Sequence, residues 1–175
     1  MPKSLETIGT YAFYGCTDLD SITIPANLAS LGASSFRGCS SLKAVAIPEN
    51  ITSLPNYLFY ECSALTHVTL HPELTTFGSY AFYGCTKLTS IDIPSSVTYL
   101  ENSAFSGCSV LDTITFGADS KLARLGNMVF ADCTNLKNIV LPAGITEFGH
   151  DNAQETLGHS IFARCSSLES IAIPD

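Results

Sequence analysis

Hydrophobic and aromatic positions recur along this chain with a fixed period. A phenylalanine is followed three residues later by a cysteine, and the cysteine three residues later by a leucine. Two apolar residues separated by one variable residue come next, and a proline usually ends the unit. The cysteines that mark the units are Cys16, Cys39, Cys62, Cys85, Cys108, Cys133 and Cys165. They are 23, 23, 23, 23, 25 and 32 residues apart, and this repetition predicts a solenoid.

The repeat divides the whole chain into seven units. We interpret residues 1–175 as a single repeat array, and as an uncapped fragment of a longer protein because it starts and stops in register. The units are 2–24, 25–47, 48–70, 71–93, 94–116, 117–141 and 142–173. A single unit cannot bury its own apolar edge, so neighbouring units must stack. The open flank at each end predicts possible end-to-end self-association.

The alternating apolar residues before each proline predict a short strand in every unit. The expected strands are 22–24, 45–47, 68–70, 91–93, 114–116, 139–141 and 171–173. Parallel strands joined by right-handed crossovers should stack in sequence order in one sheet. The segment from phenylalanine to cysteine predicts one helical turn, because residues three apart share a helix face. A glycine that often precedes this segment should provide a bend with positive φ. These glycines are Gly9, Gly32, Gly78, Gly126 and Gly158.

The motifs L-x-x-I-x-I-P and A-F-x-x-C, seen together in residues 81–94, resemble the BspA-like class of leucine-rich repeats. The resemblance covers the entire chain. It implies an α/β leucine-rich-repeat solenoid that is right-handed and curved, with one parallel β-sheet on the concave side and short helical turns and loops on the other. It also implies a bacterial or protozoan protein of the cell surface, or a secreted one. Members of this class are often adhesins that bind host matrix proteins or other cells.

Composition excludes several other classes of function. The formal net charge is −8, and only eight Lys and Arg residues are present, so binding to nucleic acid is not expected. No run approaches the ~20 apolar residues of a membrane span. No signal peptide is visible in this fragment. No nucleophile–base motif or phosphate-binding glycine loop occurs, so we expect neither an enzyme nor a bound cofactor.

The cysteines and histidines raise the question of disulfides and metal sites. The cysteine count is odd, and equivalent residues on stacked units lie ~4.7–4.9 Å apart, whereas a disulfide requires Cβ atoms ~3.8 Å apart. We therefore expect a column of free, buried thiols. His150, Asp151, Glu155 and His159 cluster in an insertion of the seventh unit. They match no metal-binding motif, so we interpret this segment as an exposed polar loop and expect no metal.

Two surfaces are candidates for binding another protein. The outward positions of the predicted sheet carry small side chains and no Trp, Tyr or Arg, although His67 and Asp92 could support a broad, hydrated contact. The predicted turns carry tyrosines in pairs three residues apart, and Ser34 and Arg37 interrupt the series in the second unit. Tyr57, Tyr60, Tyr80 and Tyr83 are the preferred partner-binding candidates. Alternatively, these rings merely cover the phenylalanine column.

We therefore predict a non-enzymatic protein–protein interaction module, part of a cell-surface or secreted adhesin. A structural spacer that holds another domain away from the cell is the main alternative. A carbohydrate-binding module is a weaker one. The repeat motif itself does not identify a ligand, so these three readings differ only in what the exposed faces contact.

Overall fold

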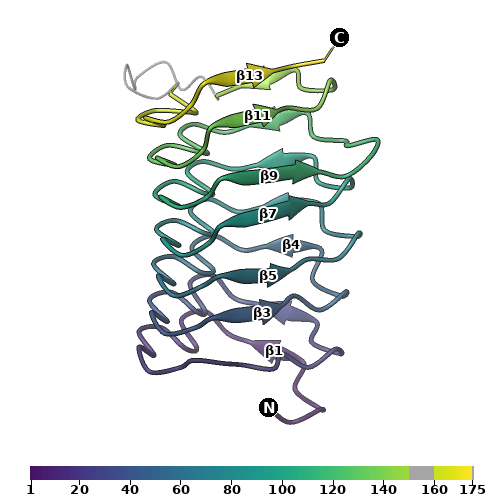
Figure 1. Ribbon diagram of the computed structural model, residues 1–175. Coiled ribbons are helices and arrows are strands. Elements are labelled where there is room, and N and C mark those ends of the chain that lie inside the picture. The colour runs from purple at the N-terminus through teal and green to yellow at the C-terminus, as the bar shows by residue number, and fades with distance from the viewer. Residues whose placement is uncertain (150–159, 175) are drawn as a thin grey trace, which may run out of the picture.

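The computed structural model describes residues 1–149 and 160–174. The chain winds as a solenoid whose turns stack along one axis, with the N-terminus at the bottom of Figure 1 and the C-terminus at the top. A front strand and a shorter back strand alternate along the chain, and all the strand pairs described are parallel. The structure thus confirms a solenoid of parallel strands.

The front strands lie within one residue of the predicted positions in the second to seventh units. They are β3 (Ala44–Ala46), β5 (His67–Thr69), β7 (Ser90–Ile93), β9 (Thr113–Phe116), β11 (Asn138–Val140) and β13 (Ser170–Ala172). No strand forms at residues 22–24. The front strands pair two by two, β3 with β5, β7 with β9 and β11 with β13, rather than in the one sheet that was expected. A two-residue insertion at 117–121 lies between β9 and β11 in the sequence, but the same kind of break occurs between β5 and β7, where there is no insertion.

A second set of strands at the back of the solenoid is absent from the sequence prediction. These strands are β1 (Thr7–Ile8), β2 (Ser30–Leu31), β4 (Ser53–Leu54), β6 (Thr76–Phe77), β8 (Tyr99–Leu100), β10 (Arg124–Leu125) and β12 (Glu147–Phe148). Five of them, β4, β6, β8, β10 and β12, form one ladder, and β1 pairs with β2. From β1 to β10 the second residue of each strand is buried, as Leu54 and Phe77 are. A two-residue element is too short for its alternation to be recognised in a sequence.

The predicted helical turns are wrong: the described residues contain no helix. Backbone N–H groups in the Phe-to-Cys segments alternate between two kinds of acceptor. The N–H of Tyr83 donates within its own turn to Tyr80 O at 3.2 Å, whereas the N–H of Phe82 donates to Ala104 O of the next turn at 2.8 Å. A helix would use every N–H inside one segment. Here half of these N–H groups form hydrogen bonds with the next turn instead, and these bonds tie each unit to the next.

The prediction that the glycines before the Phe-to-Cys segments have positive φ is also wrong. Gly9, Gly32, Gly78 and Gly126 do not have positive φ, and Gly158 lies outside the described residues. Positive φ occurs instead two residues later, as at Tyr80 (φ 59°). Gly78 is needed because a Cβ there would lie 2.6 Å from Asn56 Oδ1 and 2.7 Å from Leu54 O. These glycines therefore permit close approach of neighbouring turns, except Gly9, which has no such neighbour.

A column of phenylalanine rings forms the centre of the core. Neighbouring rings stack with centroids 5.3–5.8 Å apart from Phe13 to Phe162. The five rings from Phe36 to Phe130 are fully buried. Offset stacking of this kind stabilises aromatic pairs beyond the burial of their area. The interior is therefore one continuous apolar column, as the repeat requires.

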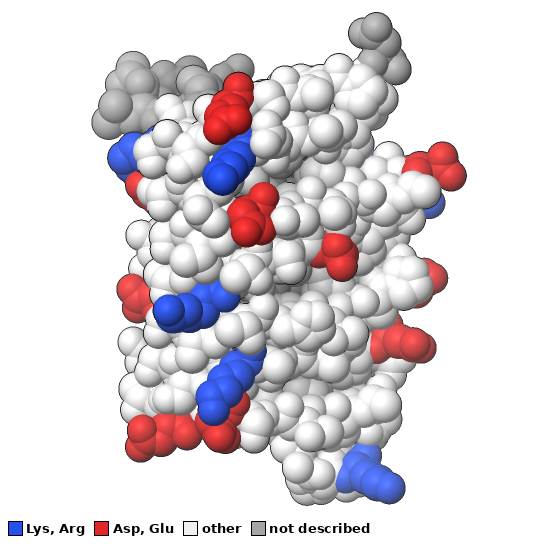
Figure 2. Space-filling model, viewed as in Figure 1, with Lys and Arg blue, Asp and Glu red and all other residues white. Residues whose placement is uncertain are grey.

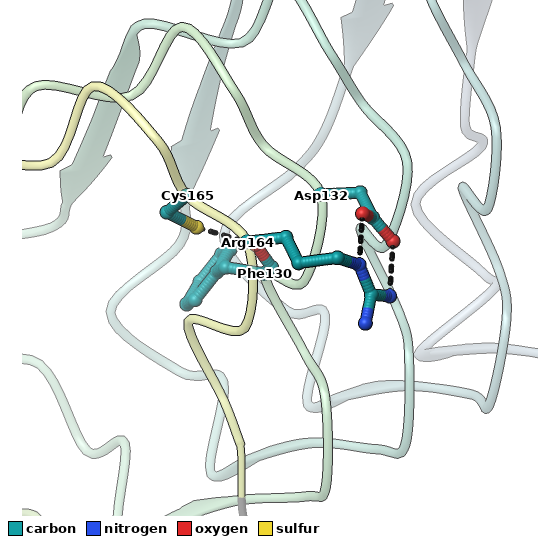
Figure 3. A network of polar contacts seen from close by, with 4 residues as sticks. All are labelled: Phe130, Asp132, Arg164 and Cys165. Atoms are coloured by element: carbon teal, nitrogen blue, oxygen red, sulfur yellow. Dashed lines mark hydrogen bonds and ion pairs between the residues drawn. The ribbon is translucent and has the colours of Figure 1, made fainter.

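The cysteines form a second column, and each thiol from Cys39 onward donates a hydrogen bond to a phenylalanine carbonyl of the preceding turn. Cys62 Sγ lies 3.1 Å from Phe36 O, and Cys165 Sγ lies 3.0 Å from Phe130 O (Figure 3). All seven cysteines are free. The expectation that all are buried fails at the ends, where Cys16 is exposed and Cys165 is half-buried, because no complete turn covers them. Burial raises the pKa of the enclosed thiols, that of Cys108 to about 12.

Candidate functional site

The four tyrosines predicted to bind a partner come together in one cluster. Tyr57 and Tyr80 stack with centroids 4.9 Å apart, and Tyr60 and Tyr83 stack at 4.7 Å. Tilted contacts of 5.8 Å join the two rings within each turn. The cluster therefore consists of two short columns side by side, on the turns that precede the front strands. These turns lie on the left in Figure 1.

The backbone of the repeat determines where these rings point. Tyr11, Tyr57 and Tyr80 occupy equivalent positions, and each has a φ of 59°. In this left-handed conformation most side chains are disfavoured, and Gly or Asn is preferred. The equivalent residues Ser34 and Ser103 also have positive φ, so the conformation belongs to the fold and not to the tyrosine. Met128 shares the conformation as well, so the backbone directs the side chain at this position whichever residue occupies it.

Arg37, which the sequence analysis took as an interruption, connects the tyrosines across the second turn. Its Cζ lies 4.4 Å from the ring centroid of Tyr60 and 5.7 Å from those of Tyr14 and Tyr57. Contacts within about 6 Å are cation–π interactions. We call Tyr11, Tyr14, Arg37, Tyr57, Tyr60, Tyr80 and Tyr83 the tyrosine–arginine surface. The signal for Arg37 was its equivalence to Tyr14 and Tyr60 in the repeat.

The tyrosine–arginine surface differs in exposure along its length. Tyr11 and Tyr14 are 59% and 56% exposed, whereas the four stacked tyrosines are half-buried by one another. The pKa of Tyr60 is raised by burial first, and then by the neighbouring Glu61 and Tyr83, while Arg37 opposes the rise. The phenol of Tyr60 is therefore neutral at physiological pH and can both donate and accept hydrogen bonds.

Beyond Tyr83 the same side of the solenoid changes character. Ser103 and Ser106 are buried at the tyrosine positions of the fifth turn. Farther along, the guanidinium of Arg164 donates two hydrogen bonds to the Asp132 carboxylate, at 2.6 and 2.7 Å (Figure 3). The hydrogen bonds from Arg164 lower the pKa of Asp132. This pair ties the sixth turn to the seventh, and its two charges compensate each other.

His67 and Asp92, the candidates on the sheet, lie on a different face from the tyrosines. They project from the front strands β5 and β7 and are exposed. The His67 ring lies 3.3 Å from Thr69 Oγ1, and Asp92 accepts a hydrogen bond from Thr115. Figure 2 shows scattered charges with wide neutral areas between them on this front face. The structure therefore does not join these two residues to the tyrosine cluster.

A shallow hollow at the ends of β9 and β11 is a feature that the sequence analysis missed. It encloses about 740 Å³ and is lined by side chains of both polar and apolar kinds, among them Asp112, Asp119, Phe116 and Val140. The two-residue insertion after β9 forms one wall.

Neither a metal centre nor a membrane span is found among residues 1–149 and 160–174. No three His, Cys, Asp or Glu side chains gather there in a metal-binding arrangement. The cluster formed by His150, Asp151, Glu155 and His159 lies outside the described residues. No long apolar helix that could cross a bilayer occurs in the same part of the chain. The expectations of no cofactor and no enzymatic activity stay predictions.

The strands, the turns and the stacked core define the class of the protein, a leucine-rich repeat solenoid. The chain belongs to the family of the BspA type leucine-rich repeat region, whose pattern matches residues 1–111 and 65–175 in six copies. The sequence-based identification of this family is therefore confirmed. No curated protein matches the sequence.

Solved structures with the same fold come from bacteria. A leucine-rich repeat protein from Bacteroides ovatus is 28% identical, with a TM-score of 0.76, and covers 98% of this chain and 47% of its own. A T. pallidum leucine-rich repeat protein is 21% identical, with a TM-score of 0.57, and covers 95% of this chain and 62% of its own. This chain thus spans about half to two thirds of the length of these proteins.

Proposed function

We propose that this chain is a protein-binding module of a cell-surface or secreted adhesin, and that the tyrosine–arginine surface contacts the partner. The observation that carries the proposal is the concentration of six tyrosines and one arginine on adjacent turns. Tyrosine and arginine, with tryptophan, are the residues in which binding energy concentrates at protein interfaces. Repeat proteins of this family serve as interaction modules, and their association with the cell surface supports the location.

The turn itself does not require tyrosine. Ser34, Ser103 and Met128 have the same positive φ at the positions equivalent to those of Tyr11, Tyr57 and Tyr80, so the strain of about 1–3 kcal/mol belongs to the fold. Tyrosine is one of the residues in which binding energy concentrates at interfaces. Its presence where the fold accepts other residues supports a contact with another molecule.

The arrangement also bears on the alternatives. Stacking covers one face of each ring in the Tyr57–Tyr80 and Tyr60–Tyr83 pairs, and Arg37 lies against the rings of Tyr57 and Tyr60. A carbohydrate would therefore have to use the outer faces of Tyr80 and Tyr83 or the exposed Tyr11 and Tyr14. A spacer would use the stacked core but would have no need of an aromatic surface. The spacer stays the alternative that an absence of binding would favour.

The test is a pair of variants measured against a panel of purified extracellular-matrix proteins by biolayer interferometry. The first variant, Tyr60→Ser with Tyr83→Ser, copies the serine that the fifth turn already carries as Ser106. Loss of an interface anchor costs ~2 kcal/mol or more, so we expect affinity to fall about 30-fold or more. The control, His67→Ala with Asp92→Ala, changes the front face and should leave affinity within about twofold.

The results separate the three functions. Binding by the wild-type chain that is lost only in the tyrosine variant supports the proposal. Loss only in the front-face variant, with the tyrosine variant folded and unchanged in affinity, places the contact on the sheet and reduces the tyrosines to a lid on the core. If no matrix protein binds the wild-type chain, the adhesin assignment fails and the spacer is favoured.

A further inference from the structure

Arg37 differs from Arg164 in the groups that its guanidinium contacts. Arg164 is paired with Asp132, but no carboxylate among the described residues lies within ion-pair distance of the Arg37 guanidinium. Its described contacts are with the three rings of Tyr14, Tyr57 and Tyr60. A guanidinium has five N–H donors in a fixed planar fork and no acceptor. These donors are available to a molecule that arrives from outside.

The rings hold this cation in place without neutralising it. Three aromatic contacts limit the rotamers that the long side chain can adopt, so little entropy is lost when it forms further hydrogen bonds. The planar fork matches the two oxygens of a carboxylate, and such bidentate pairs are stronger and more directional than neutral hydrogen bonds. Tyr14 and Tyr60 lie on two sides of the cation, with ring edges and hydroxyls that suit the apolar and carbonyl groups of a peptide.

We propose that Arg37 is the specificity anchor of the tyrosine–arginine surface and that it binds the carboxylate of an Asp or Glu residue in a segment of a partner protein. The inference rests on the proposed function and adds the chemistry of the partner. The chain's net charge of −8 does not prevent this, because charges are screened over about 8 Å at physiological ionic strength. The cation in direct contact therefore determines which side chain is accepted.

This geometry also excludes a simple cation as the main ligand. Arg37 already occupies the rings of Tyr14, Tyr57 and Tyr60, and a basic side chain placed there would meet a like charge. Glu61 is exposed beside Tyr60 and repels acidic groups. It should therefore disfavour a second acidic residue in the partner next to the one that binds Arg37. A partner segment with one acidic residue among apolar or aromatic residues fits the surface best.

The test is selection from a phage-displayed random peptide library on the immobilised wild-type chain. We expect the enriched peptides to carry an Asp or Glu at a fixed position. The peptide enriched most is then synthesised with that residue as the acid or as its amide (Gln or Asn). Fluorescence anisotropy should give about 10- to 100-fold weaker binding for the amide, since a charged hydrogen-bonded pair has this effect on affinity.

Variants of the chain show whether Arg37 is the group responsible. Arg37→Gln should weaken binding of the acidic peptide by the same factor and abolish the preference for the acid over the amide. Arg37→Lys, which keeps the charge but loses the planar fork, should recover only part of the affinity. Arg37 is half-buried and contacts three rings, so both variants should lose some stability, and a single cooperative thermal transition in each confirms that they are folded.

The outcomes test the role of Arg37 separately from the proposed function of the tyrosine–arginine surface. Enriched peptides without an acidic residue, or an unchanged acid preference in Arg37→Gln, overturn the inference. If such peptides still lose affinity in the Tyr60→Ser, Tyr83→Ser variant, the proposed function stands without it. If peptide binding is unaffected by the tyrosine variant, or if no peptide is enriched, the surface is not a peptide-binding site and both statements fall.

Discussion

Raising the pH from 8 to 10 should lower the free energy of unfolding by about 7 kcal/mol, because the five buried thiols cannot ionise in the folded chain. Burial raises the pKa of Cys39 from 9.0 to about 11 and that of Cys108 to about 12, and it raises those of Cys62, Cys85 and Cys133 as well. Above pH 9 the unfolded chain releases these protons and the folded chain retains them. Stability is therefore complete below pH 9 and declines above it, by about 1.4 kcal/mol per pH unit for each thiol.

Urea unfolding under reducing conditions at pH 8, 9 and 10 measures this decline. The matched control is the double variant Cys85→Ala with Cys108→Ala. Although it is less stable at every pH, its free energy of unfolding should fall only about three-fifths as steeply with pH, since two of the five buried thiols are gone. An equal slope in the variant would show that groups other than the cysteine column cause alkaline unfolding.

Replacing Phe82 with alanine should destabilise the chain by about 3–5 kcal/mol, the range for a fully buried phenylalanine. The ring has no exposed surface and stacks on Phe59 at 5.5 Å and Phe105 at 5.3 Å. Its removal leaves a cavity in the middle of the column and interrupts the contact between two halves of the array. Chemical denaturation monitored by circular dichroism measures the loss.

Phe13→Ala is the matched control for that substitution. Phe13 stacks on only one ring, Phe36, and is half-buried at the end of the column. Its replacement should cost only about 1 kcal/mol. Comparable losses in the two variants would mean that the column does not hold the turns together, and that the hydrogen bonds between turns do so instead.

The front strands could be predicted because two apolar residues around one polar residue recur at a constant distance from each cysteine. The helical turns were wrong because a three-residue spacing such as Phe82 to Cys85 fits a helix and also fits a chain whose N–H groups alternate between two turns. The reason for the repeated glycines was ambiguous in the same way. Gly78 is required by the approach of Asn56 and not by its own φ, and a sequence does not distinguish these reasons.

The candidate site could be predicted in part. The pairing of tyrosines three residues apart identified their common side of the turn, and the constant period placed the pairs on adjacent turns. Arg37 was missed as a member because a charged residue breaks the pattern of an aromatic series in the sequence. Its role depends on the side chain reaching Tyr60 across one turn, which is a distance that only the structure gives.

Hydroxyl-radical footprinting of the chain, alone and bound to the matrix protein or peptide that binds it most tightly, tests the central claim most directly. We predict that Tyr57, Tyr60, Tyr80 and Tyr83 become protected in the complex. Tyr99, which lies on the back ladder under Arg124, should be oxidised equally in both states and serves as the internal control. Protection of His67 on the front face with the four tyrosines unchanged would contradict the account.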